Sequence, residues 1–378
     1  MLCIGTASTM ACVTEALGLM PLGSATAPAI SADRLRIAEQ TGKIAVELVK
    51  TGVKPHDVLS KQSFENAITV LQALGGSTNA IVHLLAIAGR VPNLALTLDD
   101  FDRIGRRTPL LVDIKPSGSN YMEDLNKAGG VPRLMRVVKH LLHLDAKTVS
   151  GRTLGEELDS FPPADFAQNI VKNVESPIFP FAAIAVLRGN LAPDGCVFKQ
   201  SAAAPHLLKH SGPAVVFSSA QDMAARIDSD NLEVTADSVL IMQNIGPIGY
   251  PGMPEAGLIP IPKKLGLSGV KDKLRISDGR MSGTAEGAVV LHVAPESAVG
   301  GPLALVRTGD IVSIDVSQRR ISMDVDDEEL AKRGALWLKD NTRTAKSRGY
   351  RGLYECSVLQ ANEGADFSWL RADGTFPS

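Results

Sequence analysis

The stretch FPPADFAQNIVKNVESPIFPFAAIAVLRG, residues 161–189, divides this sequence into two parts of different character. Its four prolines interrupt regular structure, because proline lacks a backbone N–H and fixes its own φ. Helical patterns precede the stretch, and short β-branched runs follow it. A chain of 378 residues also exceeds one ordinary hydrophobic core. We therefore predict a first domain at 1–165, a linker at 166–182 and a second domain at 183–378.

The residues before this boundary predict helices separated by short glycine-rich turns. Segment 31–50 repeats apolar residues at helical spacing, with Leu35 and Val49 on one face, and Thr51-Gly52 follows as a stop. Further helices are expected at 63–74, at 77–89 with Ser77 as the cap, and after Thr97. The connections LGGS and KPSGSN carry backbone amides that could meet an anion.

The residues after the boundary predict a β-rich domain. Short apolar runs between glycine or proline turns are typical of strands, and IVSIDV and RISMDV, joined by SQR, predict a hairpin at 311–325. Other strand-like runs lie at 182–189, 213–219, 238–244 and 288–293. The predicted fold class is α/β, and the second domain is expected to be a barrel or a sandwich.

Composition excludes several classes of protein. The chain is 44% hydrophobic and 21% charged, with a net charge of −2, so it is neither disordered nor suited to nucleic acid or a lipid surface. It has neither the run of about 18 apolar residues that a membrane span needs nor a secretory signal. A cytoplasmic location is expected, with the mitochondrial matrix as the alternative. The four cysteines form no CxxC pair and predict no disulfide framework.

The segment NIGPIGYPGMPEAGLIPIPKK, residues 244–264, has the densest run of glycine and proline in the chain. Its four glycines and five prolines hold the backbone in a fixed irregular path, which a simple surface loop does not need. Glu255 is its one acid and has apolar neighbours. Such a carboxylate either pairs with Lys263 or Lys264 or is a ligand of a hard cation such as Mg²⁺.

A second motif, RISDGRMSGTAEG, spans residues 275–287. A strand-like start leads into Arg280, Ser282 and Thr284 on a glycine-flanked turn. Flanking glycines leave the Ser282 hydroxyl clear of the backbone, which suits a base, a nucleophile or a ligand. The motif is not a G-x-S-x-G elbow, and no histidine stands at a recognisable triad spacing. A glycine-rich turn with a capping serine is the alternative.

A third motif, GNLAPDGCVFKQSAAAP, spans residues 189–205. Asp194 and Gly195 predict a tight turn, followed by a strand that carries Lys199 among apolar neighbours. Lys199 could be a surface residue whose stem packs on the protein or the partner of an anion, and the sequence favours the surface position.

Together these blocks resemble the family of dihydroxy-acid, 6-phosphogluconate and sugar-acid dehydratases. The resemblance runs in order over nearly the whole chain, through GTASTM, GGSTNA, PLLVDIKPSG, MEDLNKAGG, RGNLAPDG, GYPGMPE, RISDGRMSGTA and HVAPE. It implies an α/β N-terminal domain that carries an iron–sulfur cluster and a C-terminal swivelling β-barrel domain. It also implies a hydro-lyase that removes water from a 2,3-dihydroxy acid to give a 2-keto-3-deoxy acid.

The resemblance also assigns roles to individual residues. Glu255 in GMPE matches the Mg²⁺-ligating glutamate of the family, and Ser282 in RMSGT matches the serine that removes the C2 proton. Arg280 and Thr284 belong to the same motif and are expected to orient the substrate or the serine. Serine is a weak base unless nearby positive charge lowers the pKa of its hydroxyl, so this role requires a metal or a cluster close by.

The C-terminal segment narrows the branch of the family. RGYRGLYECSVLQANEGADFSWL, residues 348–370, resembles the end of the sugar-acid dehydratases, as does GTAST where the branched-chain enzyme usually has YTANT. A sugar acid such as a pentonate is therefore the expected substrate. Three positions depart from the family pattern: Ile248 where a basic residue is usual, PLG at 21–23, and Glu286. Ile248 and Glu286 are expected to influence substrate identity.

The beginning of the sequence bears on the cofactors. The family places a cluster cysteine four residues before the glycine of GTAST, and that position is Met1 here; Cys3 could serve only with a shift of register. Two further cysteines, the remaining Mg²⁺ carboxylates and a carbamylated lysine belong to a family segment that this sequence lacks. We therefore interpret the chain as an N-terminally truncated member. The 378-residue chain is expected to hold no iron–sulfur cluster and to show no turnover. In the complete enzyme the cluster is expected to be of the [2Fe–2S] type.

Alternatives to a sugar-acid dehydratase remain. One is an inactive homologue that serves as a binding protein or partner subunit, and another is the dihydroxy-acid dehydratase of branched-chain amino-acid synthesis. The resemblance implies a homodimer or a dimer of dimers.

Overall fold

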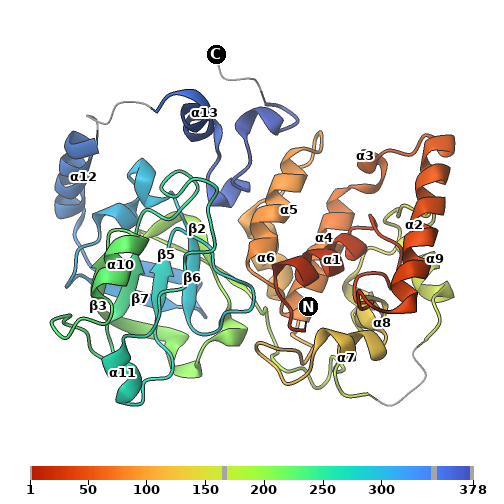
Figure 1. The fold of residues 1–378 in the computed structure, drawn as a ribbon, viewed down its shortest axis with the longest axis horizontal. Helices are drawn as coiled ribbons and strands as arrows, with labels where there is room; N and C mark the ends of the chain where they lie inside the picture. Colours follow the sequence, from red (N-terminus) through yellow and green to blue (C-terminus); the bar gives the residue numbers. More distant parts are fainter. Residues whose placement is uncertain (1, 164–167, 342–346, 375–378) are drawn as a thin grey trace. The chain divides into compact units, whose positions relative to one another are not determined.

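The computed structural model describes residues 2–163, 168–341 and 347–374 and divides into two compact units (Figure 1). The units are Met1–Ile184 and Ala185–Ser378. The described part of the predicted linker lies within the first unit, where Phe179 bridges Leu110 and Val171 bridges Val112. Residues 166 and 167 of that linker lie outside the described residues. No described helix is long and apolar enough to span a membrane.

The first unit is built from helices around a buried central helix, α4. In its described residues, β-structure is limited to isolated bridges, so the sheet expected of an α/β domain is not found in this part of the chain. Its helices are α1 (Thr6–Ala16), α2 (Ala32–Thr51), α3 (Pro55–Val58), α4 (Lys61–Leu74), α5 (Asn79–Gly89), α6 (Leu98–Gly105), α7 (Met122–Lys127), α8 (Gly130–Val137), η1 (Lys139–Leu141) and α9 (Leu154–Ser160).

Local sequence sets both ends of α4. The Ser60 hydroxyl accepts a hydrogen bond from the Ser63 N–H, and the Ser60 N–H is satisfied in return by the Ser63 hydroxyl. Gly75 ends the helix in the left-handed conformation, which glycine adopts without steric cost. The helix buries Phe64, Ile68 and most of its other residues, so its stability comes from packing on its neighbours.

Helix α2 forms where the sequence predicts it, but its apolar stripe is largely exposed in the described chain. The Ser31 hydroxyl caps it by accepting from the Arg34 N–H, and Gly52 ends it in the left-handed conformation. None of its residues is buried, and Leu35 and Val49 are 74% and 83% exposed. Periodicity predicts the helix and its apolar stripe, but it does not determine whether a partner covers that stripe.

A buried carboxylate organises the loop after α1. The two oxygens of Glu15 accept hydrogen bonds from the N–H groups of Gly23, at 2.8 Å, and Ala25, at 2.7 Å. These contacts fix the PLGSA segment, which contains one of the departures from the family pattern. Burial raises the pKa of Glu15 from 4.5 to about 7, against the lowering effect of these backbone donors.

This shift predicts a pH dependence of stability. Folded Glu15 holds its proton more tightly than unfolded Glu15, so its contribution is fully present below about pH 4.5 and is lost as pH rises to about 7. The change should amount to roughly 3 kcal/mol in the free energy of unfolding. Urea unfolding of wild type and Glu15→Gln between pH 4.5 and 7.5 measures it. Parallel pH profiles of the two proteins would contradict this assignment.

The second unit is a closed eight-stranded barrel, with strand order β1-β2-β6-β5-β4-β3-β7-β8. The strands are β1 (Ala185–Gly189), β2 (Ala192–Phe198), β3 (Lys209–Phe217), β4 (Val239–Met242), β5 (Arg275–Ser277), β6 (Val289–Ala294), β7 (Ile311–Asp315) and β8 (Arg320–Met323). The helices are η2 (Gln200–Ala202), η3 (Pro205–Leu207), α10 (Ala220–Arg226), α11 (Lys263–Leu267), η4 (Ser297–Val299), η5 (Pro302–Leu305), α12 (Asp327–Asn341), α13 (Gly349–Ser357), η6 (Ala361–Glu363) and η7 (Ser368–Leu370).

The barrel confirms the predicted hairpin, in which Ile314 pairs with Ile321 and Asp315 with Arg320. One prediction about its strands is wrong. Asp194 and Gly195 do not form a turn but lie inside β2, which turns back from β1 near Asn190. Gly195 has a φ of 103° at a register shift between β2 and β6, so glycine here serves an irregular strand.

The strand directions bring two predicted motifs to one end of the barrel. Four adjacent strands of the barrel run parallel to one another, in the order β3, β4, β5 and β6. The segments that follow β4 and β5 therefore leave the barrel at the same end, as the carboxyl ends of parallel strands do. These segments are the 244–264 and 275–287 motifs.

Candidate functional site

The segments that follow β4 and β5 are joined directly. The Gly257 N–H donates to the Arg280 carbonyl oxygen at 2.7 Å. The Arg280 guanidinium Nε in turn donates to the carbonyl oxygen of Met253. Arg280 therefore links its own segment to both sides of Glu255, and the glutamate and serine motifs form one structural assembly.

Ser282 and Thr284 form a hydroxyl pair on the turn beyond Arg280. Their oxygens, Oγ and Oγ1, lie 2.9 Å apart, and the Thr284 N–H also points to the Ser282 hydroxyl at 3.4 Å. The Ala285 N–H donates to the Ser282 carbonyl and closes the turn. Ser282 is half-buried and Thr284 is exposed, so both hydroxyls can be reached from solvent.

Glu255 is exposed and directly follows Pro254, within the segment that Arg280 contacts. Of the two lysines considered as its partner, Lys264 directs its ammonium to the carbonyl oxygens of Asp230 and Leu232. Mg²⁺ is commonly bound in proteins through one or two carboxylates, with water and substrate oxygens completing its coordination. An exposed Glu255 fits one ligand of such a site.

Two buried carboxylates hold the beginning of the Glu255 segment. Asp278 accepts from the Ile245 N–H at 3.0 Å and the Ser297 N–H at 2.8 Å. Glu296 accepts from the N–H groups of Ile248 and Gly249. Burial raises the pKa of both carboxyl groups, against these backbone donors. Ile248, which departs from the family pattern, is therefore fixed through its backbone.

The C-terminal segment holds the same loop from another direction. The Tyr354 hydroxyl donates to the Pro247 carbonyl oxygen and accepts from the Gly252 N–H, each at 2.8 Å. Gln360 bonds Glu296 twice, through its amide nitrogen and through the Glu296 backbone N–H. The segment that marks the sugar-acid branch therefore contacts the loop that carries Ile248 and leads to Glu255.

Removing the Tyr354 hydroxyl should loosen this loop. In Tyr354→Phe the Gly252 N–H and the Pro247 carbonyl lose their partner, at a cost of about 0.5–1.5 kcal/mol for each hydrogen bond. Hydrogen–deuterium exchange of a peptide covering 247–256 should then become about tenfold faster. Tyr350→Phe is the matched control, since Tyr350 lies on the same helix and is 77% exposed. Equal exchange in the two variants would show that the Tyr354 contacts do not hold the loop.

The predicted surface position of Lys199 is wrong. Only 3% of this residue is exposed, at the position between the end of β2 at Phe198 and the turn η2. Its ammonium nitrogen has no hydrogen-bond partner within the described part of the chain. Burial lowers the pKa of Lys199 to about 8, although the negative charge of Glu286 opposes this.

Within the first unit, two blocks of the predicted family pattern are joined by hydroxyl contacts. The Thr6 hydroxyl lies 3.2 Å from that of Ser77 and accepts from the Asn79 amide at 2.8 Å. The Thr9 hydroxyl accepts from the Ser77 N–H. GTASTM and GGSTNA are therefore parts of one structure, and the amide of Ser77 is used within the protein.

The predicted cluster position cannot be placed, because Met1 lies outside the described residues. Cys3 is half-buried, and its carbonyl lies 3.4 Å from the Ser8 hydroxyl. Residues 2–163, 168–341 and 347–374 contain no group of three His, Cys, Asp or Glu side chains arranged to hold a metal. Since iron–sulfur clusters are held by several thiolates, the described residues do not fit a cluster.

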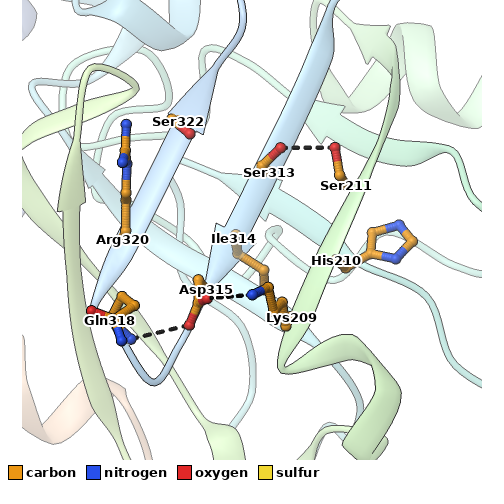
Figure 2. A pocket seen from close by; sticks show the side chains of 9 residues that line it. All are labelled: Lys209, His210, Ser211, Ser313, Ile314, Asp315, Gln318, Arg320 and Ser322. Carbon is orange, nitrogen blue, oxygen red and sulfur yellow. Dashed lines mark hydrogen bonds and ion pairs between the residues drawn. The ribbon is translucent and has the colours of Figure 1, made fainter.

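Two cavities lie away from the predicted site residues. Figure 2 shows one of about 540 Å³ on the outer face of β3, β7 and β8, where Lys209 pairs with Asp315 at 3.3 Å and Ser211 with Ser313 at 2.8 Å. The other, of about 840 Å³, lies among α1, α3 and α5 and is lined by His56 and other residues. Neither is lined by Glu255, Arg280, Ser282 or Thr284.

Sequence reasoning missed the residues that hold the site together. Glu296 and Tyr354 stand in HVAPE and RGLYE, blocks that the resemblance marks without assigning them a role. An acid between Pro295 and Ser297 in an apolar block was the available signal for Glu296, because a buried carboxylate needs donors. Nothing in the local sequence identifies Pro247 and Gly252 as the partners of Tyr354.

Comparison with known proteins identifies the family of the chain. Residues 2–157 match the sequence profile of the dihydroxy-acid/6-phosphogluconate dehydratase N-terminal domain, and residues 169–365 match that of the C-terminal domain. The chain is 46% identical over 359 residues to L-arabinonate dehydratase of Rhizobium leguminosarum bv. trifolii, a match that covers 94% of the chain and 61% of that relative.

Two further relatives are named for different substrates. The chain is 45% identical over 377 residues to 6-deoxy-6-sulfo-D-gluconate dehydratase of Pseudomonas putida, covering 99% of the chain and 64% of the relative. It is 42% identical over 362 residues to dihydroxy-acid dehydratase of Acetivibrio thermocellus, covering 95% and 64%. The chain therefore spans less than two thirds of the length of these relatives. From these matches to both domains, the chain belongs to the dihydroxy-acid/6-phosphogluconate dehydratase family.

Proposed function

We propose that this chain serves the dehydration of a sugar acid, a 2,3-dihydroxy acid that loses water to give a 2-keto-3-deoxy acid. The observation that supports the proposal most strongly is the assembly of Glu255, Arg280 and the Ser282–Thr284 hydroxyl pair at one end of the barrel. Membership of the dehydratase family and the names of the relatives support the reaction class.

In the proposed reaction Ser282 acts as the base. Its Oγ removes the proton from C2 of the substrate, the C3 hydroxyl leaves, and the proton and hydroxyl together make one water. The resulting enol becomes the 2-keto acid when C3 takes up a proton and the C2 hydroxyl of the enol releases one. The Thr284 hydroxyl lies 2.9 Å away, and because a deprotonated Ser282 Oγ can only accept, Thr284 would donate to it and so favour that form. Ser282 is half-buried, on a turn at the end of the barrel.

The proposal assigns Mg²⁺ to Glu255, which would supply one carboxylate ligand. Bound there, Mg²⁺ would provide positive charge that stabilises the enolate-like charge developing on the substrate. Arg280 fixes the backbone on both sides of Glu255, so the position of this carboxylate depends on the same segment that carries Ser282. The described residues do not fit an iron–sulfur cluster, and no step of this mechanism uses one.

A sugar acid is favoured over the branched-chain substrate of dihydroxy-acid dehydratase. The C-terminal segment resembling the sugar-acid branch contacts the loop before Glu255 through Tyr354 and Gln360. The relatives named for L-arabinonate and sulfogluconate are 46% and 45% identical, compared with 42% for the Acetivibrio dihydroxy-acid dehydratase. A pentonate is the proposed substrate.

The test joins this chain to the part of the Rhizobium leguminosarum relative that precedes the matched region. The chimera, purified without oxygen and supplied with Mg²⁺, is assayed for 2-keto acid formation from L-arabinonate, other sugar acids and 2,3-dihydroxyisovalerate. We expect product from a sugar acid by the chimera. We expect none from the 378-residue chain alone, because its described residues hold no set of cluster ligands.

Two outcomes would favour the alternatives. A folded, cluster-loaded chimera that turns over no acid would indicate a binding protein or partner subunit. Preferred turnover of 2,3-dihydroxyisovalerate would instead indicate the branched-chain reaction. Turnover by the 378-residue chain alone would contradict the expectation drawn from the lack of a metal-binding group among its described residues.

A further inference from the structure

Two buried polar atoms without partners lie within three residues of each other at the end of β2. They are the ammonium nitrogen of Lys199 and the hydroxyl oxygen of Ser201, and neither has a hydrogen-bond partner among the described residues. Buried charges in proteins are normally paired or hydrogen-bonded, because an isolated one loses its hydration without compensation. An unpartnered buried ammonium therefore marks a position that is completed by an anion.

The segment that contains Lys199 and Ser201 is bonded to one end of the turn that carries Ser282, the proposed base. The Gly287 N–H donates to the Ala202 carbonyl oxygen at 3.1 Å, which joins the end of the 282–287 turn to the segment that begins with Lys199. The turn is closed by a hydrogen bond between Ala285 and Ser282, so the α-carbons of these two residues are within about 7 Å. Ser282 and the Lys199 segment therefore belong to opposite sides of one short loop.

The residue between them, Glu286, supplies the only negative charge whose effect on Lys199 the structure records. Glu286 is exposed, and no ion pair joins it to Lys199 within the described ranges. The negative charge of Glu286 raises the pKa of Lys199, but burial lowers it by more, so that the pKa is about 8. Glu286 thus opposes the effect of burial without pairing with the ammonium in the described residues.

We propose that Lys199, together with Ser201, forms an oxyanion-binding subsite near the Gly287 end of the Ser282–Gly287 turn and that it takes the carboxylate of the sugar acid. This inference rests on the proposed function for the identity of the anion. A carboxylate has two oxygens and can accept from several donors at once, so binding by an ammonium and a hydroxyl leaves lone pairs for a metal at Glu255. Lys199 would then hold the substrate with its C2–C3 bond toward the loop.

The experiment is isothermal titration calorimetry on the 378-residue chain at pH 7 with three probes. Sodium L-arabinonate carries the carboxylate, L-arabinitol carries the hydroxyls alone, and sodium sulfate is a free oxyanion. The variants are Lys199→Met, which keeps the apolar stem, and the control Lys209→Met, whose side chain is 84% exposed beside Asp315. Glu286→Gln tests the competing charge.

We expect wild type and Lys209→Met to bind arabinonate equally and Lys199→Met to bind it at least about tenfold more weakly. Glu286→Gln should bind it a few-fold more tightly, and arabinitol should bind weakly to every protein. Lys199→Met should also melt about 2–4 °C higher than wild type, because it removes an unpaired buried charge. A structural lysine would show the opposite change in melting temperature on substitution.

Several results would overturn the inference. These are absence of arabinonate binding by wild type, equal binding by Lys199→Met, or sulfate binding as tight as arabinonate at the same residue. Binding is measured without turnover, so failure of the proposed reaction and failure of this subsite are distinguishable. If the chimera is inactive but binds arabinonate in a way that depends on Lys199, the subsite is supported and the proposed reaction fails. If the chimera is active and its KM is unchanged by Lys199→Met, the reaction is supported and the subsite fails.

Discussion

Ser282→Ala in the active chimera is expected to lower kcat for sugar-acid dehydration by about 10³-fold, with little change in KM. General-base catalysis contributes about 10² to 10⁴ in rate, and alanine leaves no group at this position that can accept the C2 proton. The effect should appear in kcat because proton removal occurs in the transition state, whereas the other proposed contacts to substrate remain. Steady-state kinetics of 2-keto acid formation measure both constants.

Two variants control this experiment. Ser313→Ala removes a hydroxyl from the outer face of the barrel, where Ser313 contacts Ser211, and should leave kcat unchanged. Thr284→Val removes the hydroxyl partner of Ser282 and should give a smaller loss, of about tenfold, since it removes one hydrogen bond and keeps the base. A Ser282→Ala protein that keeps kcat within tenfold of wild type would exclude Ser282 as the base.

Gly212→Ala is expected to destabilise the barrel by about 3 kcal/mol or more. Gly212 lies in β3 opposite Val312 of β7, and a Cβ on it would overlap the carbonyl oxygen of Asp237, which lies just before β4. That oxygen belongs to the backbone and also contacts His210 at 2.9 Å, so it cannot move aside as a flexible side chain could. Overpacking against fixed backbone displaces two neighbouring elements together.

Urea unfolding followed by circular dichroism measures this loss. Gly266→Ala is the matched control, because Gly266 lies in helix α11 and a Cβ there meets no atom within 4 Å. This control should be unchanged or up to about 1 kcal/mol more stable, as alanine favours the helix more than glycine does. Equal midpoints for the two variants would show that β3 and the Asp237 segment accommodate the added methyl group.

Much of the barrel was predictable because its signals are local. The β7–β8 hairpin follows from two β-branched runs separated by three residues, and β4 and β6 follow from short apolar runs between turns. In the first unit, the helices predicted at 31–50 and 63–74 form as α2 and α4, although α4 begins two residues earlier, at Lys61. A capping side chain bonds the backbone two or three residues away, so its partner is already present in the sequence.

Burial was less predictable than secondary structure. The sequence placed Lys199 at the surface, since lysine stems commonly pack on a protein while the ammonium remains in water. The structure buries it just after β2, next to a turn whose Ala202 carbonyl accepts from the N–H of Gly287, far away in the chain. Helix α2 shows the reverse case, in which an apolar stripe remains exposed in the described chain.

By itself, the sequence determined the two-part organisation, the predicted helices and hairpin, and the family to which Glu255 and Ser282 point. It did so because periodicity, capping and ordered motifs each reside in a few neighbouring residues. Only the tertiary structure decided that Arg280 joins the glutamate and serine segments, that Tyr354 and Glu296 hold the loop before them, and that Lys199 is buried. These contacts depend on the closure of the barrel, which brings distant segments together at one end.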